Sequence, residues 1–102
     1  MPSTITAAER AARKELLDTF VGLPQIAGLL NEVFGLTGYD EIGDRTPRLW
    51  WRRSYENWGI SHPMPQPHHV IGELRKRPFW KGKDVIVWYG EWKGERVPRW
   101  VR

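Results

Sequence analysis

A segment rich in tryptophan and arginine, residues 45–58, constrains the fold of this chain more than any other part of it. Thr46 can cap a helix, and Pro47 suits the first helical position, where the N–H that proline lacks is not needed. The segment therefore predicts a helix over Pro47–Asn57, and Gly59 is expected to end it.

Two kinds of side chain share this predicted helix. Trp51, Tyr55 and Trp58 recur at helical spacing and fall on one stripe, which suits burial. Arg48 and Arg52 flank the stripe, and a guanidinium group matches both a phosphate and the edge of guanine. A solvated charged helix with an aromatic core face has the same pattern, so these residues alone leave both interpretations open.

Charge is distributed unevenly along the chain. Residues 1–44 carry three basic and seven acidic side chains, a net charge of −4, whereas residues 45–102 carry thirteen basic and five acidic ones, a net charge of +8. A basic half of this kind indicates a polyanionic partner. A membrane surface is a weaker candidate, because no stretch separates a cationic face from an aliphatic one.

Signatures of catalysis and metal binding are not found. The chain has no cysteine, which excludes disulfides and thiolate metal sites and suits a reducing cytoplasm. It has no apolar run long enough to span a membrane, no signal-peptide pattern, no glycine-rich phosphate loop and no nucleophile motif. His62, His68 and His69 do not suggest a metal site, because adjacent histidines on extended backbone point to opposite faces. We expect no enzyme, cofactor, metal or small-molecule substrate.

Two helices are predicted before the arginine-rich one. Thr6 and Glu9 fit a capping box that opens a helix over Ala7–Phe20, which Gly22 ends. A second helix begins at Pro24, and its apolar residues recur with helical periodicity: Ile26, Leu29, Leu30 and Val33.

Several shorter elements follow. Residues 36–44 form a predicted loop, and His62–Pro67 is a proline-stiffened connector. Val70–Leu74 and Pro78–Trp80 predict two short strands around the basic tip Arg75–Arg77.

The segment Asp84–Trp92 fits either a helix or a strand. Asp84 could cap a helix whose one face holds Val85, Trp88, Tyr89 and Trp92, but the composition is typical of a strand.

Seven tryptophans can supply much of a small core, because each aromatic side chain buries a large area. We expect four of them to be buried: Trp51, Trp58, Trp80 and Trp88. Trp92 and Trp100 are the candidates for exposure, where they could stack on a base or contact a partner chain.

Three segments follow one another in a recognisable order. They are Gln25-Ile-Ala-Gly-Leu-Leu30, then Pro65-Gln-Pro67, and most specifically Arg77-Pro-Phe-Trp-Lys-Gly-Lys-Asp-Val-Ile-Val-Trp88. This order resembles the winged helix-turn-helix of the excisionase-like and MerR-like DNA-binding families over residues 24–92. The resemblance implies a mainly α fold with a small β-wing, an extra N-terminal helix, and a helical Asp84–Trp92.

The resemblance also implies which residues contact DNA. The Pro47–Asn57 helix would enter the major groove, and the wing tip, Leu74–Pro78, would lie along the phosphates or the minor groove. The implied contact residues are Arg45, Arg48, Arg52, Arg53, Arg75, Lys76, Arg77, Lys81 and Lys83. The implied DNA-binding domain covers residues 23–92, between a helical arm (1–22) and a basic tail (93–102).

The chain departs from the family pattern between its second and third helices. The family joins these helices by a tight turn, whereas Asn31–Thr46 is far longer. Either the turn holds an insertion, or the second helix runs on to about Phe34 before Gly35 ends it.

The leading hypothesis is sequence-specific binding of double-stranded DNA, as an excisionase-type recombination directionality factor or a small transcription regulator. A homo-oligomer or cooperative array is expected, with the N-terminal helix or the tail Val97–Arg102 between copies. The alternative is a protein-interaction module, such as a small inhibitor anchored by Trp92 and Trp100, in which Asp84–Trp92 pairs with the tail as a hairpin. A weaker third possibility is a single-strand binder.

Overall fold

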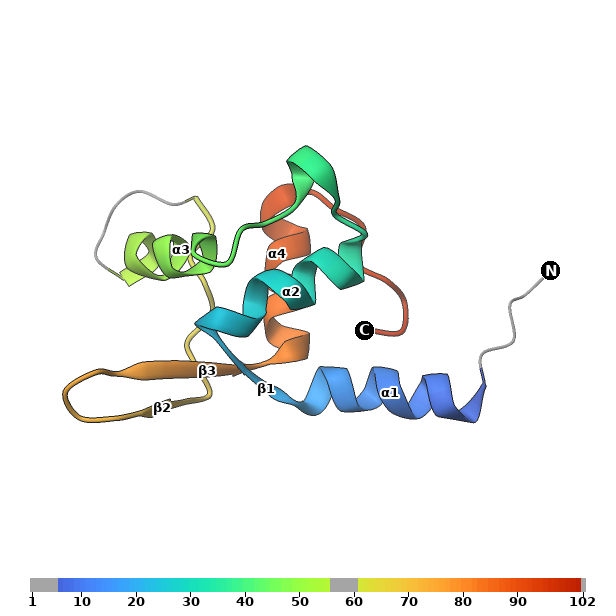
Figure 1. The fold of residues 1–102 in the computed structure, drawn as a ribbon, viewed down its shortest axis with the longest axis horizontal. Coiled ribbons are helices and arrows are strands. Elements are labelled where there is room, and N and C mark those ends of the chain that lie inside the picture. Colours follow the sequence, from blue (N-terminus) through green and yellow to red (C-terminus); the bar gives the residue numbers. More distant parts are fainter. Residues whose placement is uncertain (1–5, 56–60, 102) are drawn as a thin grey trace.

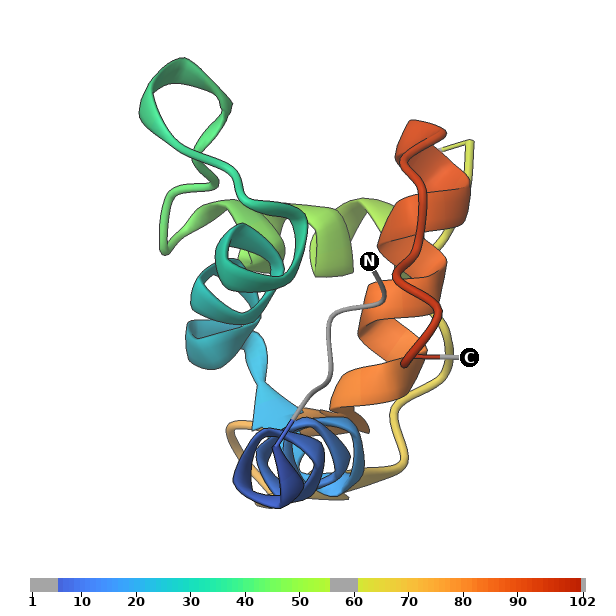
Figure 2. The same ribbon diagram turned by 90° about the vertical axis from the view of Figure 1, so that its right-hand side faces the viewer.

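Four α-helices and one three-stranded antiparallel sheet make up residues 6–55 and 61–101, the parts of the chain that the structure, a computed structural model, describes. In chain order the elements are α1 (Ala7–Asp18), β1 (Phe20–Gly22), α2 (Leu23–Phe34), a short 3-10 turn η1 (Gly38–Asp40), α3 (Thr46–Tyr55), β2 (His69–Ile71), β3 (Arg77–Lys81) and α4 (Gly82–Lys93) (Figure 1). Helices α2, α3 and α4 lie over one face of the sheet (Figures 1 and 2).

The sheet contains a strand that the sequence analysis missed. The expected helix over Ala7–Phe20 is wrong at its end, because α1 stops at Asp18 and Thr19 is extended. Residues 20–22 form β1, which pairs with β3 so that Val21 lies opposite Trp80. Three residues are too few to show an alternating pattern, and their pairing partner is distant in sequence. The β-structure is therefore larger than a wing alone.

The predicted hairpin is confirmed, with different bounds. Strands β2 and β3 are antiparallel and Ile71 lies opposite Arg77. The first strand ends at Ile71, three residues before the expected Leu74, and the second begins at Arg77 within the expected tip. The turn is thus residues 72–76, longer than the two-residue turns of the tightest hairpins.

The long connection between the second and third helices begins later than Asn31, because the second helix continues to Phe34 as one of the two expectations had it. Helix α2 runs to Phe34, and Gly35 follows in the left-handed conformation. The loop beyond it is closed by one side chain: the Asn31 amide donates to the Ile42 carbonyl (3.0 Å) and accepts from the Ile42 N–H (2.8 Å). Ile42 is buried, so this clamp ties the end of the loop to α2.

The ambiguous segment 84–92 is helical, as the resemblance implied. It lies within α4, where Val85 and Ile86 are fully buried. Asp84 is not the cap, because Lys81 holds that position; Asp84 lies in the first turn, where a negative charge complements the helix dipole. The prediction that this segment pairs with the tail as a hairpin, made for the protein-interaction alternative, is therefore wrong.

Helix α3 buries a different ring from the one expected. Pro47 and Trp50 are buried, whereas Trp51 is half-buried and Tyr55 is 37% exposed. Trp50 packs against the rings of Trp88 and Trp92 in α4, with centroids 5.6 and 5.3 Å away. The predicted apolar stripe is wrong because it left out Trp50. Helix α3 packs on α4 through Trp50 and on the sheet through Trp51. Trp58 and the predicted helix end at Asn57 lie outside the described residues.

Trp80 and Trp88 are core residues, as predicted, but the expected exposure of Trp92 and Trp100 is wrong. Both are half-buried, because Trp92 stacks on Trp88 and the tail folds back along α4 (Figure 2). Val101 is buried in the same core. The described part of the tail is thus packed against the domain.

The proline-rich connector is attached to the core by side-chain hydrogen bonds. The Trp88 indole donates to the His62 carbonyl (2.9 Å), and the Trp80 indole donates to the Pro65 carbonyl (2.7 Å). Met64 is buried, its N–H donates to Ser54 (2.9 Å) and its carbonyl accepts from the Tyr55 hydroxyl (2.8 Å). The connector therefore joins α3 to the sheet in one arrangement.

Helix α4 starts so close to α1 that a side chain does not fit between them. A Cβ on Gly82 would overlap the Leu16 carbonyl oxygen, and the Gly82 N–H already donates to the Thr19 carbonyl (3.0 Å).

We expect Gly82→Ala to lower the free energy of unfolding by more than about 1 kcal/mol. Gly28→Ala is the matched control: its Cβ would meet nothing within 4 Å, and alanine is the better helix former. Urea titration of both variants tests this, and equal stability would contradict the close approach of α1 and α4.

Candidate nucleic-acid interface

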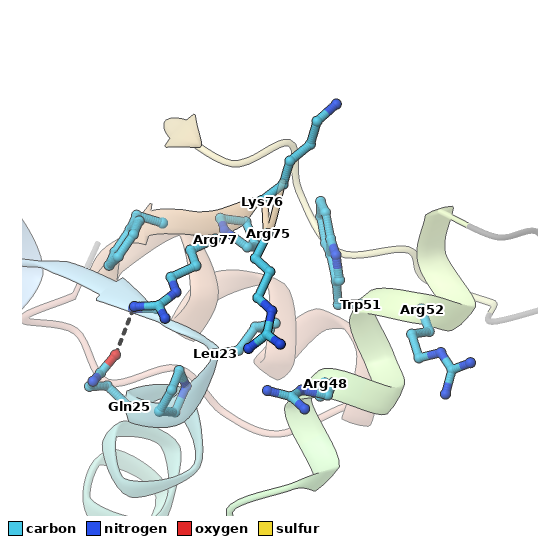
Figure 3. A pocket seen from close by; sticks show the side chains of 12 residues that line it. Leu23, Gln25, Arg48, Trp51, Arg52, Arg75, Lys76 and Arg77 are labelled. Carbon is cyan, nitrogen blue, oxygen red and sulfur yellow. Dashed lines mark hydrogen bonds between the residues drawn. The ribbon is translucent and has the colours of Figure 1, made fainter. Parts of the chain in front are cut away.

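A groove of about 590 Å³ lies between α3 and the β2–β3 ribbon (Figure 3). Its charged lining consists of five cationic side chains: Arg48, Arg52, Arg75, Lys76 and Arg77. No acidic side chain from the described ranges lines it. Leu23, Trp51 and Phe79 supply apolar surface between the charges. A concave surface lined by one sign of charge raises the local concentration of oppositely charged ligands.

Two elements bring these cations together. Arg48 and Arg52 are four residues apart on α3, so they lie on the same edge of the helix. The other three come from the end of the hairpin turn and the start of β3. Trp51 contacts Trp80 of β3, with ring centroids 5.4 Å apart at 79°, and this contact holds the helix beside the ribbon.

The cationic side chains differ in direction. In Figure 3, the guanidinium groups of Arg48 and Arg75 point into the space between the helix and the ribbon, and Arg77 points towards Gln25. Lys76 extends outward, and Arg52 points away from the ribbon. Two like charges directed into one space repel each other, so an anion placed between them would be stabilised.

The nine contact residues implied by the resemblance are all exposed, but they do not all lie together. Besides the five in the groove, Arg45 precedes α3 and Arg53 lies on it, and neither lines the groove. Lys81 lies at the opposite end of β3, about 13 Å along the strand from Arg77. Lys83 follows it in the first turn of α4. The structure thus separates the last two lysines from the groove.

One part of the groove was missed by the sequence analysis. Leu23, Pro24 and Gln25, the first residues of α2, line it. The Gln25 side chain accepts from the Gly22 N–H (3.0 Å), which orders the start of the helix. A helix N-terminus carries partial positive charge, which adds to that of the side chains. Pro24 marked where the helix begins, but no local signal shows what that end faces.

Tyr55 anchors the C-terminal end of α3. Burial raises the pKa of its hydroxyl, which donates to the Met64 carbonyl. Because the folded-state pKa lies above the unfolded one, this stabilisation is fully present below about pH 10 and is lost as the pH rises through the folded-state value. The helix that carries Arg48 and Arg52 is therefore anchored throughout the neutral range.

Within residues 6–55 and 61–101, no three histidine, aspartate or glutamate side chains converge to hold a metal ion. In the same ranges, no helix has the length and hydropathy to cross a bilayer. Comparison with protein-family models, curated proteins and solved structures finds no match to this chain.

The groove predicts stabilisation by a small polyanion. With tripolyphosphate at about five times its dissociation constant, we expect the free energy of unfolding to rise by about 1 kcal/mol, which raises Tm by about 4–8 °C. Arg48→Gln and Arg75→Gln should lose most of this shift, measured by thermal unfolding at constant ionic strength. Arg99→Gln, an exposed tail arginine outside the groove, is the control and should keep it. An equal shift in all three variants would show general ion binding instead.

Proposed function

We propose that this chain binds double-stranded DNA, with α3 in the major groove and the β2–β3 ribbon on the adjacent backbone or minor groove. The observation that carries this proposal is the groove in which five cations from these two elements line one concave surface. Phosphate contacts supply most of the affinity of such proteins, and contacts to base edges supply the specificity.

The dimensions of α3 suit this role. Its ten residues span about 15 Å, and an α-helix fits the major groove of B-DNA. Arg48 and Arg52 are about 6 Å apart along the helix axis, close to two base-pair steps of about 3.4 Å. The Arg48 side chain is exposed and points into the groove, so its guanidinium group can reach a duplex (Figure 3).

The element order supports a winged helix-turn-helix as the finer description of the fold. Helices α2 and α3 would form the helix-turn-helix, with residues 35–45 as an enlarged turn. The β2–β3 ribbon would be the wing, and β1 would add a third strand beside β3. The clamp between Asn31 and Ile42 supports this description of the fold. It holds the two ends of the long connection together, so the length of the connection does not determine the distance between α2 and α3.

An excisionase-type recombination directionality factor and a small transcription regulator both fit this binding mode. A single helix reads few base pairs, so we propose several copies side by side on DNA. Of the two segments considered for contact between copies, α1 is favoured: none of its residues is buried, whereas the tail is packed through Val101. The small-inhibitor alternative has lost its support, because Trp92 and Trp100 are packed into the domain.

Selection of bound duplexes from a random pool tests the proposal directly. We expect a defined motif, and binding to it that weakens by about three powers of ten between 50 and 200 mM salt if about six phosphates are contacted. Single-stranded oligonucleotides of the same sequence are the control. Binding that ignores sequence at moderate salt, or that prefers the single strand, would contradict sequence-specific duplex recognition.

Two arginine variants should behave differently on the selected motif. Arg48→Gln should lower affinity by about 1–3 kcal/mol and relax the preference at one position, because it removes a base contact. Arg75→Gln should weaken binding to all sequences and reduce the salt slope by about 1, because it removes a phosphate contact. Fluorescence anisotropy at several salt concentrations measures both, with Arg99→Gln as the control. Identical behaviour of the two variants would count against the assigned division of roles.

A further inference from the structure

The tip of the β2–β3 ribbon presents apolar surface beside its cations. Leu74 is completely exposed (101%), and Val70 and Ile71 on β2 are 47% and 53% exposed. Isolated exposed apolar residues are ordinary, but here three lie within five positions of one projecting ribbon. Figure 1 shows this ribbon reaching beyond the helices.

The turn that carries Leu74 is closed on itself. Gly72 has a φ of 100°, and a Cβ at this position would overlap the Arg75 carbonyl oxygen. Only glycine fits such a conformation without strain, so the backbone folds tightly around the apex. Leu74 lies between these two residues, and its exposure follows from the shape of the turn.

The three residues that follow Leu74 are part of the cationic groove. Arg75, Lys76 and Arg77 follow it directly and line the groove. Glu73 is the one acidic residue in the sequence of the turn, so the tip remains positive. Successive residues lie at most about 3.8 Å apart, so phosphates held by these cations would bring Leu74 to the edge of a DNA groove.

We propose that Leu74 is an apolar wedge that enters the minor groove between two base pairs, unstacks them and bends the duplex. This inference rests on the proposed function. The faces of the bases are apolar, so an aliphatic side chain can replace a stacked base, which a charged side chain cannot do. Leucine is among the residues that act as wedges in DNA-bending proteins, and the flanking cations would hold the phosphates while the step opens.

The test uses the selected duplex with 2-aminopurine in place of adenine at each step of the site, because this base brightens when it is unstacked. Wild-type protein should raise the fluorescence at one step and bend the DNA by roughly 20–90° in a circular-permutation mobility assay. Leu74→Ala should abolish most of both signals while weakening binding by about tenfold or less, because the phosphate contacts remain. Leu74→Met should keep both signals.

Tyr39→Ala is the matched control, because Tyr39 is equally exposed (109%) and lies in η1, within the loop between α2 and α3. Figure 1 shows this loop, in green, on the far side of the helices from the ribbon. Tyr39→Ala should leave bending, fluorescence and affinity unchanged. The Tm of Leu74→Ala should equal that of the wild type, since the side chain makes no buried contact.

The outcomes separate the wedge from the proposed function. If wild-type protein binds the duplex but Leu74→Ala bends and brightens it equally, the wedge is overturned and DNA binding stands; the ribbon's apolar surface then belongs to a protein contact. If wild-type protein binds no duplex, both fall together.

Discussion

The burial of Trp80 determines the geometry on which the rest of the structure depends. This ring is fully buried, lies opposite Val21 of β1 and contacts Trp51 of α3. Its indole nitrogen also donates to the Pro65 carbonyl, so the connector is attached at the same point. Protein interiors are densely packed, and one rigid side chain shared by sheet, helix and connector leaves little freedom between them. The position of α3 relative to the ribbon is therefore set before any ligand binds.

This arrangement concentrates positive charge at one end of the molecule. Five cationic side chains line the groove and, among the described residues, no acidic one does, so their mutual repulsion opposes folding slightly. The aromatic core offsets that repulsion. The exposed acids Asp40 and Glu41 belong instead to the loop between α2 and α3, and Figure 1 shows this loop, in green, on the far side of the helices from the ribbon. A charge distribution of this kind orients the molecule as it approaches a polyanion, which favours encounters through the groove.

The parts that the sequence predicted well are those with local signals. The helical periodicity of α2 and the exposure of Arg48 could be read directly, whereas α4 needed the family resemblance because its strand-like composition is overridden by burial. Strand β1 could not be found, because three residues carry no pattern and their partner lies far along the chain. The groove itself depends on the contact between Trp51 and Trp80, which no local spacing reveals. Lys81 was grouped with the wing cations because it is close to them in sequence. It lies at the other end of β3, and the direction of that strand is known only from the structure.

The clamp between Asn31 and Ile42 has a consequence for how such a domain can vary. Because two hydrogen bonds join the ends of residues 32–41, the entropy of closing that segment changes only slowly with its length. Residues added or deleted within 37–41, where every side chain is exposed, would leave α2 and α3 in place, so natural variants could lengthen or shorten this loop while keeping the same groove.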